Sequence, residues 1–139
     1  RPRSSTTGVL QSAWFADRRM TVEDPRMENV FLWCRGVDTA VTPKTSNDET
    51  AGVLLGLMKN GDIVIRHCYK MRKAWHEARR MILSQARVDG QKVVMAFGNT
   101  GSQSGFADDI RYNDPEFAPF IVEAVWVCTS RALPNGFFV

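Results

Sequence analysis

The chain has 139 residues, of which 44% are hydrophobic, so it is long enough for one domain with a real core and too short to expect two. Its formal charge of +3 and pI near 9.0 are mildly basic, which permits a polyanionic partner without demanding one. No apolar run approaches the length of a membrane span, and the N-terminus has neither a signal peptide's apolar core nor an initiator Met. We therefore expect no membrane partner, and a piece of a longer protein with a linker over residues 1–12 and one domain over residues 13–139.

The three cysteines, Cys34, Cys68 and Cys128, are an odd number, are widely spaced, and each lies in a strand-like apolar segment. This spacing argues against a disulfide framework and against a zinc knuckle. We expect buried free thiols in a reducing cytoplasm.

Hydrophobic periodicity predicts seven elements after an aromatic anchor at Trp14 and Phe15 and a loop over residues 21–29. In chain order they are a strand over 30–38, a strand over 50–58, a strand over 63–69, a helix over 74–88, a strand over 92–97, a helix over 106–112 and a strand over 121–127. Asn60 and Gly61 predict a type I′ hairpin turn, because both residues tolerate a positive φ. In the first helix, the residues that share one face are Trp75, Ala78, Ile82 and Ala86.

The order of these elements predicts an α/β fold. The hairpin makes neighbouring strands antiparallel, and the helix over 74–88 is a crossover that delivers the strand over 92–97 parallel to the first strand. We expect an RNase H-like mixed five-stranded sheet, with antiparallel hairpin strands plus parallel strands, flanked by helices.

Two acids flank the loop between the first two strands. Asp38 ends an apolar strand, and a buried acid costs free energy unless it is paired, hydrogen-bonded or bound to a cation. Asp48 lies just before the second strand. Paired acids at one end of a sheet suit Mg²⁺ or Mn²⁺, because hard cations prefer oxygen ligands. Asp also commonly caps a turn after a strand, and this alternative remains open for Asp38.

Several short motifs follow one another in a characteristic order. They are Trp14-Phe15, Val37-Asp38-Thr39-Ala40, Asp48-Glu49-Thr50-Ala51-Gly52-Val53, and Gly101-Ser102 with Gly105 before a helix. From about Gly8 to Tyr112 the chain thereby resembles the C-terminal nuclease domain of the large terminase subunit of tailed bacteriophages. The resemblance implies an RNase H-like fold that cuts concatemeric viral double-stranded DNA with two Mg²⁺ or Mn²⁺ ions in the host cytoplasm. It also implies, as partners, an ATPase domain of the same chain, the portal and the small terminase subunit.

The same resemblance makes Asp38 the catalytic residue and central metal ligand, with Asp48 as an accessory metal ligand. The second metal-binding acid of the resembled nuclease domains is expected at the end of the strand over 92–97, where this chain has Ala96 and Phe97. Their third is expected beyond the fifth strand, but no acid follows Glu123, which we place near the start of its strand, at the end opposite Asp38. The domain is therefore expected to be a weak or inactive enzyme, or to lack its final segment.

A basic stretch favours DNA as the partner. Six of the 18 Lys and Arg residues fall within fifteen positions, namely Arg66, Lys70, Arg72, Lys73, Arg79 and Arg80. We take Arg72, Lys73, Arg79 and Arg80 as DNA-binding candidates. Ser102, in the small-residue loop before the second helix, is a further candidate for contact with the phosphate backbone. A solvated helix face and a plain strand-to-helix connection are the alternatives.

The sequence is compatible with three functions. The leading one is a metal-dependent endonuclease domain of a packaging terminase. The second is a non-catalytic RNase H-like DNA-binding or docking module of the packaging motor, and the third is another RNase H-like enzyme such as a transposase or resolvase. His67 and His76 form no catalytic or metal pair by spacing, and Asp108 and Asp109 are expected on a solvated helix face.

Overall fold

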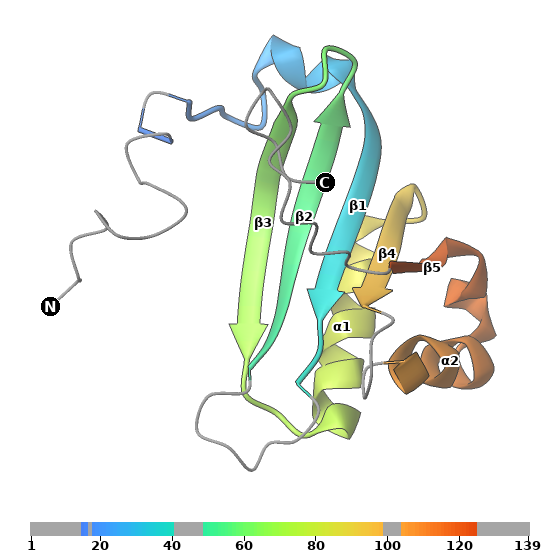
Figure 1. Ribbon diagram of the computed structural model, residues 1–139. Coiled ribbons are helices and arrows are strands. Elements are labelled where there is room, and N and C mark those ends of the chain that lie inside the picture. Colours follow the sequence, from blue (N-terminus) through green and yellow to red (C-terminus); the bar gives the residue numbers. More distant parts are fainter. Residues whose placement is uncertain (1–14, 17, 41–48, 99–103, 125–139) are drawn as a thin grey trace, which may run out of the picture.

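The fold is described by a computed structural model over residues 15–16, 18–40, 49–98 and 104–124 (Figure 1). Its elements are η3 (Pro25–Asn29), β1 (Val30–Asp38), β2 (Thr50–Met58), β3 (Ile63–Met71), α1 (Trp75–Asp89), β4 (Val93–Gly98), α2 (Ser104–Asn113), η5 (Pro115–Phe120) and β5 (Ile121–Ala124). The five strands form one sheet in the order β3-β2-β1-β4-β5. β2 is antiparallel to both β1 and β3, whereas β1, β4 and β5 are parallel.

The sheet is covered on one face. α1 lies across that face, and α2 with η5 lies beside β4 and β5 (Figure 1). The core lies between the sheet and these helices, and its buried residues are Val37, Ile82, Leu83, Met95, Phe97, Ala107, Ile110, Phe117 and Ile121. None of the described helices is long and apolar enough to cross a bilayer.

The expected architecture and element order are confirmed, with shifts at the ends. β1 and β2 have the expected bounds, while β3 runs two residues further, to Met71. β4 is described one residue further along than expected, over Val93–Gly98. β5 is described as far as Ala124, so the rest of the expected strand, to 127, lies outside the described residues, as does the linker over 1–12.

The expected type I′ turn at Asn60 is wrong. Gly61 has a φ of 89°, but Asn60 does not have a positive φ. The Met58 N–H donates to the Asp62 carbonyl at 2.9 Å, and the Gly61 N–H donates to the Met58 carbonyl at 2.9 Å. The loop thus has three residues and ends in a glycine with positive φ, which is the second common way to close a hairpin.

A buried ion pair joins α1 to the sheet. Arg35 is in the middle of β1 and only 1% exposed, although the strand was expected to be apolar there. Its Nε and Nη2 donate to the two Asp89 carboxylate oxygens at 2.6 and 2.7 Å. Gln85 adds a donor to Asp89 at 3.0 Å, and the third guanidinium nitrogen lies 3.1 Å from His67 Nδ1. The charges are therefore held in bidentate geometry with further polar partners, which a buried pair requires.

Tyr69 packs over the same arginine. The guanidinium carbon of Arg35 is 5.4 Å from the centroid of the Tyr69 ring, a cation–π distance. The hydroxyl end of the ring also lies against Gly52 of β2, where an added Cβ would be 2.2 Å from Tyr69 Cζ. Gly52 is thus required by this close approach, and burial raises the pKa of the Tyr69 hydroxyl.

Removing Asp89 tests the ion pair. Asp89→Ala leaves a buried guanidinium without its carboxylate and should lower the free energy of unfolding by about 3–5 kcal/mol, measured by urea denaturation. The double variant Arg35→Met/Asp89→Leu should recover most of this loss, because both charges are gone. Asp108→Ala, at an exposed ion pair with Arg111, should cost less than about 1 kcal/mol. An Asp89→Ala loss as small as that of Asp108→Ala would contradict the assignment.

The pH dependence gives a second readout of this pair. Burial alone raises the pKa of Asp89, but hydrogen bonds from Arg35 and Gln85 and the arginine charge outweigh it, so the pKa lies below its usual value. The stabilisation is therefore complete above the ordinary Asp pKa of about 3.9 and is lost as pH falls through the lower folded value. Below about pH 4 the wild type should therefore lose stability faster than Arg35→Met/Asp89→Leu, as measured by urea denaturation over a pH series.

Candidate functional site

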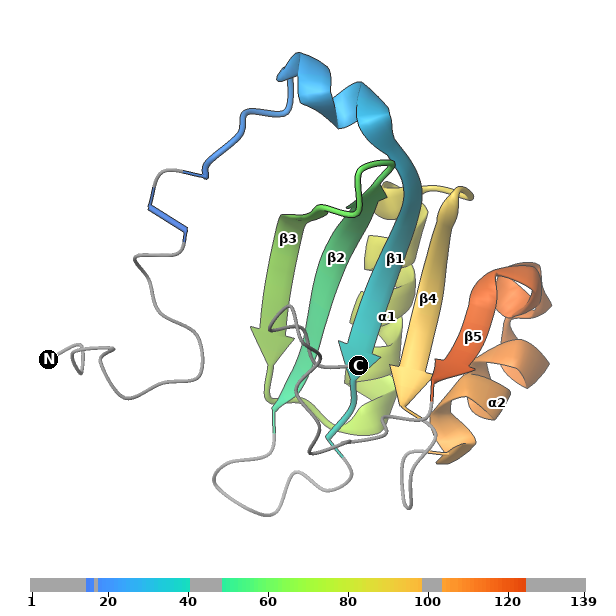
Figure 2. The same cartoon turned by 45° about the horizontal axis from the view of Figure 1, so that its top comes forward.

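The candidate site residues gather at one edge of the sheet. β1, β3, β4 and β5 all end at this edge, which we call the carboxyl edge, and β2 begins there (Figure 2). α1 also begins close to it, since only three residues separate the end of β3 from Trp75. In α/β sheets with parallel strands, ligands commonly bind outside the carboxyl ends of the strands.

Asp38 is the last residue of β1 and pairs with Ala51 of β2. Its neighbour Val37 is buried against the helices, so Asp38 is on the other face of the sheet, where it is exposed. It lines a groove of about 560 Å³ whose other described lining residues are Gly36, Val37, Ala51, Gly52, Val53, Cys68, Tyr69 and Lys70. Asp38 thus ends the first strand as expected, but the premise that it is a buried acid is wrong, because its side chain is on the exposed face of the sheet.

Glu49 is a second acid at this edge that sequence reasoning did not use. It lies directly before β2, and its carboxylate is 3.2 Å from Lys70 Nζ and 3.5 Å from Arg72 Nη2. Both cations come from the end of β3 and its continuation. The signal was visible in the sequence, because an antiparallel hairpin brings the start of β2 beside the end of β3.

The described acids do not fit a two-ion site. Two-metal cleavage needs about three converging carboxylates that hold cations roughly 3.5–4 Å apart. No group of three or more His, Cys, Asp or Glu side chains suited to a metal occurs among the described residues. β4 ends at this edge in Phe97 and Gly98, which offer no ligand side chain, and Asp48 lies outside the described residues.

The expected position of Glu123 is wrong. Because β5 begins beside Met95, partway along β4, and runs parallel to it, Glu123 pairs with Phe97, which in turn pairs with Val37. It therefore lies at the same end of the sheet as Asp38, not at the opposite end. Paired residues on neighbouring strands have their side chains on the same face of the sheet, and Phe97 is buried on the helix side. Glu123 is therefore on the helix side as well, where its carboxylate lies 3.4 Å from Arg111. The two acids are consequently on opposite faces.

Arg79, a DNA-binding candidate, contacts carboxylates of the protein itself. It reaches from α1 to Asp109 of α2, with Nε 3.0 Å from Oδ2, and its Nη2 bonds to Asp114. The indole N–H of Trp75 also donates to Asp109, at 2.8 Å. Asp109 was expected on a solvated face, and this expectation is wrong, because the side chain joins α1 to α2.

The other DNA-binding candidates differ in position. Arg72 and Lys73 lie between β3 and α1 at the carboxyl edge, and Lys73 is 3.9 Å from Glu77. Arg80 is exposed on the second turn of α1. Ser102 lies outside the described residues. Arg72 and Lys73 thus lie together at the carboxyl edge, Arg80 lies further along α1, and Arg79 faces α2.

The thiols are only partly as expected. Cys34 is half-buried on β1, and burial raises the pKa of its thiol. Cys68, on β3, is exposed, so its expected burial is wrong, since an edge strand leaves more of its surface open. Both are free, and Cys128 lies outside the described residues.

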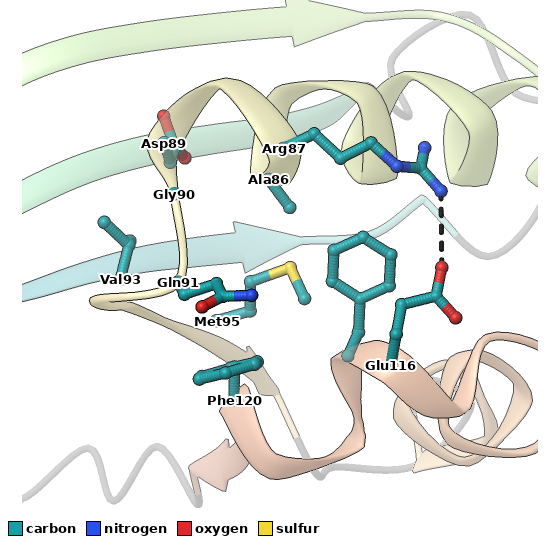
Figure 3. Close-up of a pocket in the computed structure, with 10 residues that line it drawn as sticks. Ala86, Arg87, Asp89, Gly90, Gln91, Val93, Met95, Glu116 and Phe120 are labelled. Carbon is teal, nitrogen blue, oxygen red and sulfur yellow. Dashed lines mark hydrogen bonds and ion pairs between the residues drawn. The ribbon is translucent and has the colours of Figure 1, made fainter.

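A separate pocket of about 260 Å³ lies near the other end of the sheet, between the end of α1, the start of β4 and η5 (Figure 3). Its apolar side chains include Val93, Met95 and Phe117. The acids around it are already paired, because Asp89 bonds to Arg35 and Glu116 lies 3.4 Å from Arg87. This pocket offers no acid for chemistry, which leaves the carboxyl edge as the candidate site.

Comparisons with protein-family models, with curated proteins and with solved structures give no match for this chain.

Replacing Arg79 separates the structural role from a DNA role. Arg79→Ala removes the cation between Asp109 and Asp114 and should lower the free energy of unfolding by about 1–2 kcal/mol, because charged hydrogen bonds at partly buried sites have this size. The neighbouring Arg80→Ala is exposed and should change it by less than about 0.5 kcal/mol. Equal effects of the two variants in thermal or urea denaturation would count against the assignment.

Proposed function

We propose that this chain is the RNase H-like domain of a large terminase subunit of the tailed-phage type, and that it holds double-stranded DNA at the carboxyl edge. Its setting would be the host cytoplasm, with the ATPase domain of the same chain, the portal and the small subunit as partners implied by the resemblance. The observation that carries the DNA assignment is the clustering of cations where the strands end and α1 begins.

The cations of this edge come from consecutive parts of the chain. Lys70 ends β3, Arg72 and Lys73 form the connection, and Arg80 is on the second turn of α1. All four are exposed, so phosphates can reach them without rearrangement of the core. Cations that neutralise phosphates release counterions, and this gives affinity without sequence preference.

The acids of this edge limit the affinity. Glu49 already forms ion pairs with Lys70 and Arg72, and Glu77 lies 3.9 Å from Lys73. A phosphate must therefore compete with a carboxylate for each of these three cations. These ion pairs are solvent-exposed and are worth only about 0–1 kcal/mol each, which a phosphate contact can exceed. We therefore expect weak, strongly salt-dependent binding.

Charge reversal tests the edge directly. The double variant Arg72→Glu/Arg80→Glu should weaken binding to a double-stranded oligonucleotide by about tenfold or more at low salt. It should also reduce the slope of log affinity against log salt by about 0.9 for each phosphate that the variant no longer neutralises. Fluorescence anisotropy over a series of salt concentrations measures both quantities.

The matched control is Lys59→Glu/Lys92→Glu. Lys59 follows β2 and Lys92 precedes β4, so both are exposed at the opposite edge, and the change in net charge is the same. This control should keep most of the affinity and the salt slope. If both double variants weaken binding equally, the effect belongs to net charge and the edge is not the DNA site.

Metal-dependent cleavage is the second candidate, favoured by the position of Asp38 in an open groove that Lys70 also lines. The lack of further acids argues against cleavage. β4 ends in Phe97 and Gly98, and the sequence has no Asp or Glu in residues 99–103, after β4, or in residues 125–139. The described ligands do not hold two ions, so we derive no catalytic step through a metal. The geometry favours DNA holding over cutting.

Mn²⁺ distinguishes the two candidates. We expect the wild type and Asp38→Ala to give the same calorimetric signal when titrated with Mn²⁺ and the same absence of plasmid nicking. Nicking by the wild type that disappears in Asp38→Ala would establish the cleavage candidate in place of DNA holding alone.

A further inference from the structure

The outer side of β3 is an open strand edge. β3 is the first strand in the sheet order and pairs only with β2 among the described residues. It is nine residues long, and two large apolar side chains near its start, Ile63 and Ile65, are 60% and 54% exposed. Such an edge presents unpaired N–H and C=O groups that can accept another strand.

A groove runs beside this edge. It has a volume of about 600 Å³ and separates the start of β3 from the chain segment before η3. Its described lining residues are Phe15, Arg18, Arg19, Met20, Thr21, Val22, Met27, Ile63, Val64, Ile65 and Arg66. The lining thus combines apolar side chains with three arginines and, within the described chain, contains no carboxylate.

A bulge sets the position of Arg66. The pairing of β2 with β3 shifts between Leu54 and Leu55, and Arg66 is the residue of β3 that has no partner in the register. Bulges commonly redirect a side chain. Here the guanidinium carbon of Arg66 lies 5.4 Å from the centroid of a Trp33 ring. The cation therefore lies beside the exposed start of the strand, with no carboxylate partner among the described residues.

We propose that the outer edge of β3, from Ile63 to Arg66, binds an extended acidic and apolar segment of a partner protein as an added strand. Main-chain hydrogen bonds to the open edge give affinity, and alternate side chains give specificity. In such a segment, apolar side chains pack on Ile63 and Ile65, while carboxylates meet Arg18, Arg19 and Arg66.

The chemistry of the groove favours this occupant over two others. A DNA backbone has no apolar side chain to cover Ile63 and Ile65, so these residues would remain exposed in such a complex. A second copy of the chain would bring the same arginines to the groove, and like charges at an interface oppose association. Charge complementarity thus selects an acidic segment.

This surface is independent of the proposed DNA site. β3 starts at the opposite end from the carboxyl edge, where Lys70 and Arg72 lie. Binding of a partner segment can therefore fail while DNA binding holds, and the reverse. The inference does not rest on the terminase assignment.

Synthetic peptides test the proposal. The probe is a peptide of about ten residues that alternates Val and Glu, labelled for fluorescence anisotropy. Two control peptides have the same length: one alternates Val and Lys, and the other is the Val/Glu peptide interrupted by proline, which cannot pair as a strand. The Val/Glu peptide should bind about tenfold or more tightly than either control. In NMR spectra of the isotope-labelled protein, the amide signals that shift when the Val/Glu peptide is added should centre on residues 63–66.

Variants locate the site. Ile65→Ser, which removes an apolar contact, and Arg66→Glu, which reverses a charge, should each weaken binding of the acidic peptide about fivefold or more. The controls Val88→Ser and Lys92→Glu, at exposed positions of α1 and before β4, should not. Unchanged amide spectra elsewhere verify the fold of each variant.

Three results would overturn the proposal. The first is binding of the proline-interrupted peptide as tight as that of the Val/Glu peptide, and the second is unchanged binding of the Val/Glu peptide by both Ile65→Ser and Arg66→Glu. The third is perturbation of residues 63–66 by self-association or by a DNA duplex but not by the acidic peptide. Sedimentation of the free protein detects the self-association.

Discussion

The buried pair of Arg35 and Asp89 determines how the helical layer sits on the sheet. Two charges removed from water are costly, and only a geometry that satisfies the carboxylate and most of the guanidinium compensates. Asp89 is the last residue of α1, and Arg35 is in the middle of β1, so the pair fixes the C-terminal end of the helix over the centre of the sheet. The other end of α1 then begins near the ends of β1, β3 and β4, which places Lys73 at the carboxyl edge and Arg80 on the next turn of the helix.

Local patterns were sufficient to predict the mixed sheet. Alternation in β1 and β2, the change to a helical period in α1, and the glycine at position 61 are properties of neighbouring residues, which a single sequence displays. The hairpin and the crossover helix then leave few ways to arrange the strands. This is why the mixed sheet was predicted, while the geometry of the turn at Asn60 depended on one backbone angle and was not.

Partnerships between distant residues could not be read in the same way. Arg35 and Asp89 are 54 positions apart, and nothing in the apolar pattern of β1 distinguishes a buried arginine with a partner from an exposed one. Asp109 was assigned to solvent because its helix is amphipathic, yet Trp75 and Arg79 approach from another helix. Glu123 was misplaced because the register of β5, which begins beside Met95 partway along β4, depends on pairing between distant segments.

The carboxyl edge combines acids and cations in a way that bears on function. A site that holds two divalent ions needs an excess of carboxylates, because the ions bring positive charge that must be compensated. At this edge Lys70 and Arg72 already compensate Glu49, and β4 contributes Phe97 and Gly98 in place of an acid. Cations that exceed the carboxylates can contact phosphates directly. The residues present therefore suit an edge that grips the DNA backbone with its own side chains, and Asp38 would then limit how closely a phosphate approaches.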